Sequence, residues 1–476
     1  SDYPNHDLLT CRWVNESKQL RNEMAYKFRL VARGFQEVDA PISDSPTAQK
    51  SVMRMCMIMC NIKAWRLESL DIRAAFLQSN DLERIVLMIP PKEFRTSDEI
   101  VWKIKKPIYG LNDGARKWFM TMKKKLTEYG CKPLTLDPSV YVYHVENGLS
   151  GFCVLHVDDF LIGGNETFYR EIIEKLSSEY EISSRNKGTF TYVGWNINQD
   201  SNSIVIDQIT YQSGIKPIEL PVARRNQTDH EANQSEKKLY QQLLGKLQWI
   251  SSQSRPDIRF PVLECSMMAC KPHIKDILTI NKVVKKMNKT TVKINFGIPH
   301  CSVRDLKILA FSDAALSNLP DKTSSTRSFV VFLSGKGKLA PLSWCSRKLE
   351  RVAKTIIYAE GIALGKCLDE AINLKQTLLE IMNLDKEDVV NNDLIPIIGI
   401  TDSKSLWDNI NSTSQAGDLK LRREVASIRE QLELKEVAEV KWTPTELQLA
   451  DCLTKSTAPN ESLIHVLTTG EFNIQL

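Results

Sequence analysis

The chain has 476 residues and a formal net charge of +5, from 63 basic and 58 acidic side chains, and 42% of its residues are hydrophobic. A chain of this length is expected to form about three domains with ordinary buried cores. Its 11 cysteines, an odd number without paired short spacings, argue against a disulfide framework and favour a reducing, intracellular setting. No apolar stretch approaches the roughly 20 residues of a membrane span, and the N-terminus is too polar for a signal peptide.

The first suggestive segment carries basic side chains at even spacing, at Lys27, Arg29 and Arg33. Because successive side chains of a strand point to opposite faces, a strand would place all three on one face. That face is suited to a phosphate group, although an ordinary solvated strand face explains the spacing equally well. The Met-rich run that follows, residues 51–60, predicts a core helix rather than a zinc site, since no histidine lies near its two cysteines.

Two apolar segments place acidic residues where strands end. Asp71 follows an alternating segment, and Asp158 and Asp159 interrupt an apolar run that continues into glycines. The second pattern predicts a β-hairpin whose tip projects both carboxylates. Two adjacent desolvated negative charges need a positive partner, and a divalent metal such as magnesium is the usual one. An acidic surface turn is the alternative reading of this pair. If Asp71 joins the pair across neighbouring strands, two metal ions can clamp the oxygens of a phosphoryl displacement.

Basic residues gather in two stretches. Between Val101 and Leu126 there are eight against one acid, Asp113, and between Lys271 and Lys293 there are seven lysines against Asp276. Such clusters suit a nucleic-acid backbone, although solvated helix faces also carry them. Helical patterns are predicted around residues 166–180, 240–252 and 276–287, with a strand hairpin at 192–206.

The C-terminal third carries four acids in a strand, helix, strand, helix order. They are Asp313, Glu360, Asp402 and Asp451. Taken singly, each of these acids is consistent with a helix cap or a surface position. Together they predict a second carboxylate site that only a fold can assemble, with two magnesium ions about 4 Å apart and at least one raised pKa.

These motifs, in this order, resemble those of copia-type retrotransposon reverse transcriptases. The resemblance rests on residues 26–35, on 70–77, on 108–111 with Arg116 and Trp118, and on the Val-Asp-Asp hairpin; residues 208–211, 240–247 and 255–258 resemble that family's thumb and connecting region. The four C-terminal acids in their order resemble those of ribonuclease H, and residues 324–332, 343–344 and 450–455 again resemble the copia-type family.

The resemblance implies a role for each matching residue. Asp71, Asp158 and Asp159 are then the polymerase metal carboxylates, with Mg²⁺ or alternatively Mn²⁺, and Asp313, Glu360, Asp402 and Asp451 are those of the ribonuclease. Phe76 falls at the family's aromatic gate against a ribonucleotide 2′-hydroxyl. Lys27, Arg29 and Arg33 would face the nucleotide triphosphate.

The chain departs from the family at several positions. His156 stands where the family usually has tyrosine, and Asp113 lies in the loop where it has a glutamine beside the incoming nucleotide. We expect Asp113 to repel the triphosphate and to raise the Michaelis constant. Gly361 departs from the family pattern around the second C-terminal acid, and no histidine lies near Asp451.

The sequence therefore predicts an α+β chain: a right-hand polymerase with fingers, palm and thumb, followed by a ribonuclease H-like α/β domain. The expected boundaries are 1–165 for fingers and palm, 166–304 for thumb and connection, and 305–476 for the ribonuclease H domain. The expected partners are an RNA template, a DNA or tRNA primer, RNA–DNA hybrid and dNTPs, without a membrane. Since the chain begins with Ser1, we expect a piece of a longer polyprotein that supplies an integrase segment, in cytoplasmic virus-like particles with access to the nucleus.

Two other function classes stay open. A degenerate or domesticated copy would bind nucleic acid without polymerising, and a structural subunit of a particle would keep the acids only by chance.

Overall fold

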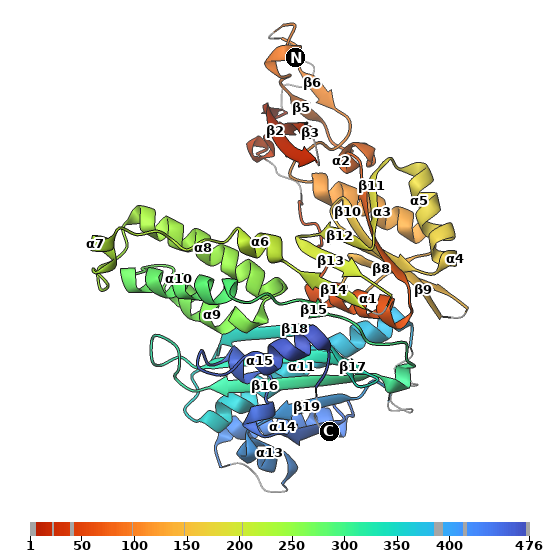
Figure 1. The fold of residues 1–476 in the computed structure, drawn as a ribbon. Coiled ribbons are helices and arrows are strands. Elements are labelled where there is room, and N and C mark those ends of the chain that lie inside the picture. Colours follow the sequence, from red (N-terminus) through yellow and green to blue (C-terminus); the bar gives the residue numbers. More distant parts are fainter. Residues whose placement is uncertain are drawn as a thin grey trace. The chain divides into compact units, whose positions relative to one another are not determined.

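The computed structural model describes residues 6–20, 23–38, 42–97, 99–146, 148–201, 203–384, 394–412 and 417–472. The chain divides into two compact units (Figure 1). The first comprises Ser1–Ala48 and Glu68–Asn186, and the second comprises Gln49–Leu67 and Lys187–Leu476.

A six-stranded sheet forms the centre of the first unit. Its order is β11 (Ile182–Lys187), β4 (Arg66–Ile72), β10 (Asp159–Gly164), β9 (Gly148–His156), β8 (Val140–Val145) and β7 (Lys132–Pro133). Strands β9 and β10 are antiparallel, with His156 opposite Asp159, so the predicted hairpin is confirmed. Strand β4 neighbours β10, which brings Asp71 to the strand beside that hairpin.

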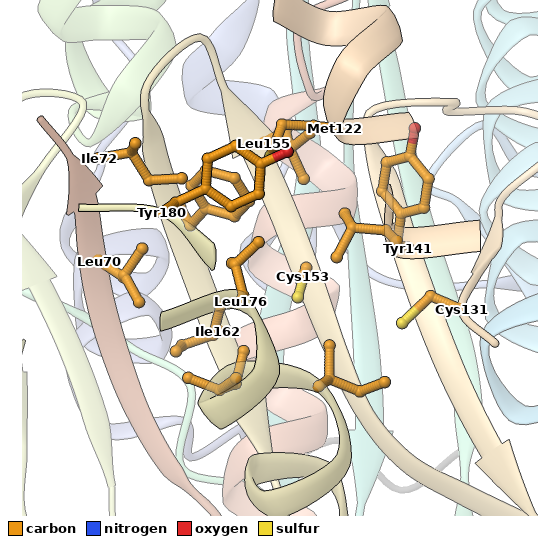
Figure 2. Close-up of a cluster of buried hydrophobic side chains, with 14 of the residues drawn as sticks. Leu70, Ile72, Met122, Cys131, Tyr141, Cys153, Leu155, Ile162, Leu176 and Tyr180 are labelled. Carbon is orange, nitrogen blue, oxygen red and sulfur yellow. The ribbon is translucent and has the colours of Figure 1, made fainter. Parts of the chain in front are cut away.

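Helix α3 (Gly114–Glu128) packs on this sheet, and so does a continuous helical stretch in three segments. These segments are α4 (Glu166–Phe168), the π-helical η3 (Tyr169–Ile173) and α5 (Glu174–Glu179). Figure 2 shows Leu176 of α5 and Met122 of α3 in one buried cluster with Ile72, Leu155 and Ile162 of the strands. The helical pattern predicted at 166–180 is therefore correct. The expected boundary at residue 165 divides this single core, because the apolar face of the following helices covers the sheet that contains the β9–β10 hairpin.

The remaining strands of the first unit form two small sheets. They are the hairpin of β2 (Cys11–Leu20) and β3 (Glu23–Ala32), and the sheet of β1 (Leu8–Leu9), β5 (Val86–Met88) and β6 (Trp102–Ile104). Leu9, Ala32, Val86, Met88 and Leu111 share a core there. The short helices are η1 (Gly34–Gln36), α2 (Ala75–Gln78) and η2 (Lys92–Phe94). Lys27 and Arg29 lie on β3, as predicted, whereas Arg33 lies just beyond its end.

The second unit begins with α1 (Lys50–Ile62), which is buried over most of its length, as the Met-rich pattern predicts. A four-stranded sheet follows, with β12 (Thr189–Tyr192), β13 (Trp195–Gln199), β14 (Ile204–Asp207) and β15 (Ile294–Asn295). Helices α6 (Ile209–Ser213), α7 (Val222–Arg225), α8 (Gln234–Gln253), η4 (Pro256–Ile258), α9 (Arg259–Met267) and α10 (Ile274–Asn288) come between β14 and β15. Their core includes Tyr240, Leu247, Ile277 and Val284.

The last part of the second unit is a five-stranded sheet with the order β18-β17-β16-β19-β20. Its strands are β16 (Lys307–Ala315), β17 (Thr326–Gly335), β18 (Lys338–Lys348), β19 (Ile397–Thr401) and β20 (Glu439–Trp442). The first three are antiparallel, and β16, β19 and β20 are mutually parallel. Parallel neighbours require crossover connections, and helices α11 (Ile356–Met382), α13 (Lys404–Asn411) and α14 (Leu419–Glu433) lie in these connections (Figure 1).

Short helices complete this domain: η5 (Val303–Asp305), η6 (Thr445–Leu447), η7 (Asp451–Leu453) and α15 (Glu461–Thr469). Three antiparallel strands extended by parallel strands and crossover helices form the predicted ribonuclease H-like α/β domain. The expected α+β class is confirmed. In the described ranges no helix has the length and apolar character to cross a membrane.

Candidate active sites

The tip of the β9–β10 hairpin is held in place by the rest of its unit. Val157 has φ +59°, a left-handed conformation that β-branched residues rarely adopt. The buried indole of Trp118 on α3 donates from Nε1 to the carbonyl of Val157 at 2.8 Å. The amide of Ile72 on β4 donates to the carbonyl of Asp158 at 3.2 Å. Trp118, which the sequence showed only as a motif residue, thus positions the turn that carries Asp158.

Asp71 and Asp158 line one pocket of about 560 Å³. Lys27 and Arg29 line it as well, as does Tyr109. Burial raises the pKa of Asp158, and the charge of Asp71 adds to that effect, whereas Lys27 and Arg29 oppose it. The pocket therefore combines two carboxylates with three cations, the third being Arg73, a suitable lining for a triphosphate held through metal ions.

Other residues predicted for this site lie elsewhere. Asp159 begins β10 and is outside the set of described residues that line the pocket. Arg33 follows β3, and its Nη1 donates to the Thr10 hydroxyl at 3.4 Å. Conversely, Ser183 on β11 was not predicted; its hydroxyl donates to the carboxylate of Asp71. A lone serine in a polar strand carries no signal from which sequence reasoning could find it.

Phe76 packs in the core at 9% exposure, with its ring centroid 4.9 Å from that of Tyr109. Tyr109 lines the pocket, and the Arg29 guanidinium lies 5.5 Å from the centre of its ring. The structure thus places Tyr109, and not Phe76, among the described residues at the pocket surface. The gate role of Phe76 stays a prediction, now with Tyr109 as its packing partner.

Asp113 does not lie where the loop comparison placed it. Its carboxylate is 2% exposed and accepts from Arg84, from Nη2 at 2.8 Å and from Nε at 3.2 Å. Arg84 also pairs with Glu37 at 2.5 Å. Because Arg84 balances its charge in a buried position, Asp113 does not face an incoming nucleotide. The expected repulsion of the triphosphate is therefore withdrawn; the sequence could not reveal a partner 29 positions away.

His156 ends β9 and is half-buried. Burial lowers the pKa of its imidazole, and Asp158 opposes that shift. Burial therefore favours the neutral form of the ring that stands beside the carboxylates in place of the family's tyrosine.

The C-terminal acids assemble more tightly. Asp313 lies on β16, Glu360 on α11, and Asp402 follows β19. Because β16 and β19 are parallel neighbours, their carboxyl ends meet at one sheet edge, and α11 packs against both strands. One ligand oxygen from each of the three acids lies within 4.8 Å of the other two. In the described part of the chain, this is the one group of three metal-ligand side chains at such distances.

The pKa shifts of these carboxyls report their crowding. Burial raises the pKa of Asp313 to about 7, with Lys455 and Thr454 opposing and Asp402 adding. Burial and the charge of Asp313 raise the pKa of Glu360 well above its ordinary value, and burial raises that of Asp402. The prediction of a raised pKa in this set is confirmed.

Asp451, the fourth predicted acid, lies beside this group. It begins η7, and its Oδ1 pairs with the ammonium of Lys455 at 2.5 Å. The same ammonium lies 3.8 Å from Oδ2 of Asp313. Of the four acids, three therefore converge and the fourth is joined to them through a lysine.

The three converging carboxylates fit a hard divalent cation. Their donors are all oxygens, as Mg²⁺ and Mn²⁺ prefer. Oε2 of Glu360 is buried and has no hydrogen-bond partner among the described residues. A buried, unpartnered carboxylate oxygen is costly, and a metal ion at this point would satisfy it.

Comparisons with known proteins agree with this arrangement. Residues 2–228 match the sequence model of a family described as reverse transcriptase (RNA-dependent DNA polymerase). The Retrovirus-related Pol polyprotein from transposon RE1 of Arabidopsis thaliana is 24% identical over 376 residues, covering 75% of this chain and 25% of that protein. The Retrovirus-related Pol polyprotein from transposon TNT 1-94 of Nicotiana tabacum is 26% identical over 412 residues, covering 80% of this chain and 30% of that protein. The resemblance to copia-type Pol proteins is confirmed, and the chain spans about a quarter of the length of such relatives.

Among solved structures, LC11-RNase H1 in complex with RNA/DNA hybrid is similar at 16% identity, covering 33% of this chain and 99% of that chain, with a TM-score of 0.24. Because this TM-score is low, the C-terminal fold is defined by its strand order and not by the superposition.

Proposed function

We propose, from the premise that residues 2–228 belong to the reverse transcriptase family, that this chain copies RNA into DNA and cleaves the RNA strand of the resulting hybrid. The observation that carries the polymerase assignment is the pocket that Asp71 and Asp158 share with Lys27 and Arg29. The observation that carries the ribonuclease assignment is the convergence of Asp313, Glu360 and Asp402.

In the polymerase site the protein acts by positioning charge. Magnesium, when bound, supplies Lewis-acid neutralisation of phosphoryl oxygens. Asp71 and Asp158 would hold it, and Trp118 fixes the turn that presents Asp158. Lys27 and Arg29 are placed to attract the triphosphate of a dNTP, and the ring of Tyr109 is placed at the pocket wall to pack against a sugar or base. This division of work fits phosphoryl transfer, in which the protein contributes mainly orientation and electrostatics.

In the ribonuclease site Asp313, Glu360 and Asp402 would hold the metal that neutralises the scissile phosphate. The buried carboxylates of Asp313 and Glu360 would fix the position of that charge, and Asp402 is half-buried beside them. The metal ion would be Mg²⁺, with Mn²⁺ as the alternative, since both take carboxylate oxygens.

A basic helix face in the second unit supports a nucleic-acid partner. All seven lysines of the predicted cluster are exposed on or next to α10; they are Lys271, Lys275, Lys282, Lys285, Lys286, Lys289 and Lys293. Positions 282, 285, 286 and 289 repeat at helical spacing and so share one face. Such a stripe suits the phosphate backbone of a primed template or hybrid, with salt-dependent binding.

Fingers, palm and thumb roles, a tRNA or DNA primer, an integrase segment from the same polyprotein and a place in cytoplasmic virus-like particles belong to the same proposal. They follow from the copia-type resemblance, not from the geometry of the sites.

The test is a pair of assays on the full chain: extension of a primed RNA template with magnesium and dNTPs, and cleavage of a labelled RNA–DNA hybrid. We expect both activities. Asp158→Asn should remove extension and spare cleavage, and Glu360→Gln should do the reverse. Asp81→Asn and Glu461→Gln, at exposed acids, are the matched controls and should change neither. Binding of the primed template without extension or cleavage would instead support the degenerate-copy alternative.

A further inference from the structure

The C-terminal acids have a positively charged side chain beside them, that of Lys455. The ammonium of Lys455 lies 2.5 Å from Oδ1 of Asp451 and 3.8 Å from Oδ2 of Asp313. It therefore sits between two carboxylates that come from different elements, β16 and η7.

The backbone that carries Lys455 is held in place. The hydroxyl of Thr454, which is 0% exposed, donates to Asp313, and its carbonyl accepts from Nδ2 of Asn318 at 2.7 Å. The hydroxyl of Ser328 on β17 donates to the carbonyl of Ala450 at 2.9 Å. These contacts fix both ends of the short segment, so the lysine side chain starts from a defined point beside the acids.

The charge of Lys455 acts on the whole site. It favours the ionised forms of Asp313, Glu360 and Asp402 alike. The three acids already supply oxygens within 4.8 Å of one another without Asp451. The triad can thus hold one ion by itself, and the ammonium of Lys455 lies between Asp313 and the fourth acid, Asp451.

The side chain of Lys455 is exposed enough to move away from the acids into solvent. The Lys455 side chain is 42% exposed, whereas that of Asp313 is 2% exposed. A four-carbon stem can turn a strongly hydrated ammonium into solvent without disturbing the buried acids.

We propose that Lys455 is a built-in counter-ion that occupies the second cation position of the ribonuclease site, between Asp313 and Asp451, and that a second divalent ion binds only by displacing it. This inference deepens the proposed ribonuclease function and rests on it. Lys455 is a positioning residue for the metal site: it keeps the four acids together when no second ion is bound, and it sets the concentration at which that ion enters.

The test counts divalent ions on the full chain by calorimetric titration with Mn²⁺, without nucleic acid. Lys455→Met keeps the stem and removes the charge. We expect the second ion of the C-terminal site to bind at least about threefold more tightly, since an ammonium partly open to solvent competes only modestly. The first ion, in the triad, should change little. Lys455→Arg, which keeps the charge, should resemble the wild type, and so should the control Lys420→Met at an exposed lysine.

A second measurement needs no variant and remains informative if Lys455→Met does not fold. Acetylation of Lys455 in the wild-type protein, followed by mass spectrometry, should rise several-fold when saturating Mg²⁺ is added, because the displaced amine enters solvent. Unchanged second-ion affinity in a folded Lys455→Met, or unchanged acetylation, would overturn the proposal. If the wild type does not cleave the hybrid but acetylation of Lys455 still rises with Mg²⁺, only the ribonuclease function would be contradicted.

Discussion

The two carboxylate centres of this chain are built in opposite ways. At the C-terminal centre Asp313 and Glu360 are 1% and 4% exposed, and three acids already stand within 4.8 Å. At the N-terminal centre Asp71 and Asp158 are partly exposed at the wall of an open pocket, and Asp159 does not line it. The fold alone brings the C-terminal acids together, whereas Asp71 and Asp158 lie at the wall of an open N-terminal pocket.

The supporting elements explain the difference. Asp313 and Asp402 are fixed by adjacent parallel strands within a sheet, and the helix that bears Glu360 packs against both. Asp158 stands on a two-residue turn that is held by the indole hydrogen bond of Trp118 and the amide hydrogen bond of Ile72. Burial of the acids raises their pKa values, repulsion between their charges adds to that rise, and Lys455 opposes it. An open site avoids that repulsion and leaves room for a triphosphate.

The largest expected effect is the separation of the two activities. Glu360→Gln should lower hybrid cleavage by at least about a hundredfold, because loss of a metal ligand costs more than loss of its supporting contacts. Primer extension should stay within about twofold of the wild type if the centres are independent. Both assays, run on the same preparation, measure this separation. A parallel loss of primer extension would contradict the independence of the two centres.

Glu360→Gln should also raise the melting temperature without divalent ions, because the folded wild type must either bury the charge of this carboxyl or take up a proton to neutralise it, and the amide avoids both costs. Differential scanning calorimetry of the full chain checks this. A lowered melting temperature would mean that the carboxylate of Glu360 stabilises the metal-free fold.

The next effect concerns the buried pair beside the polymerase pocket. Asp113→Asn should destabilise the first unit by about 1–3 kcal/mol, because Arg84 loses a charged partner in a 2%-exposed position. The Michaelis constant for dNTP should not fall. Denaturant unfolding and steady-state kinetics give the two readouts, and a lower Michaelis constant at unchanged stability would restore the idea that Asp113 faces the nucleotide.

A smaller effect should follow from the turn that holds Asp158. Trp118→Phe removes the 2.8 Å hydrogen bond to Val157 and should lower the extension rate by about tenfold, with cleavage unchanged. Trp195→Phe is the matched control: it is an equally buried tryptophan, and its Nε1 has no hydrogen-bond partner within the described part of the chain. Equal losses of extension in both variants would assign the effect to packing.

The smallest expected effect is a pH dependence. The carboxyl of Asp313 keeps its proton to a pKa of about 7 when folded, against an ordinary 3.8, so the folded state binds more protons between these values. The free energy of unfolding without divalent ions should therefore fall as pH rises from about 4 to about 7, by about 1 kcal/mol or more relative to Asp313→Asn. Urea titrations of both proteins test it. A wild type that gains stability over Asp313→Asn in that window would contradict the buried, crowded state of this carboxyl.

Sequence reasoning found most of the fold because the local patterns agree with it. The alternation around Asp158 and Asp159 predicted the hairpin, and the four C-terminal acids predicted an α/β domain that places three of them together. It failed where long-range partners decide the outcome. Arg84 and Asp113 are 29 positions apart, and Lys455 contacts Asp313 from a distant part of the sequence.

Motif analogy predicts roles that the position of a residue along its element does not decide. Phe76 and Asp159 lie on the expected elements, yet packing turns one into the core and leaves the other outside the pocket lining among the described residues. Period and spacing determine which face of an element a residue occupies, but they do not determine which of several close neighbours reaches the surface of a cavity.

The most direct test of the preassembled ribonuclease centre is Mn²⁺ binding to the full chain without nucleic acid, compared among the wild type, Glu360→Gln and Asp158→Asn. The difference between the two centres predicts that Glu360→Gln abolishes the tightest ion, that Asp158→Asn retains it, and that ions dependent on Asp158 bind only after primed template and dNTP are added. Loss of the tightest ion in Asp158→Asn, with its retention in Glu360→Gln, would contradict the account.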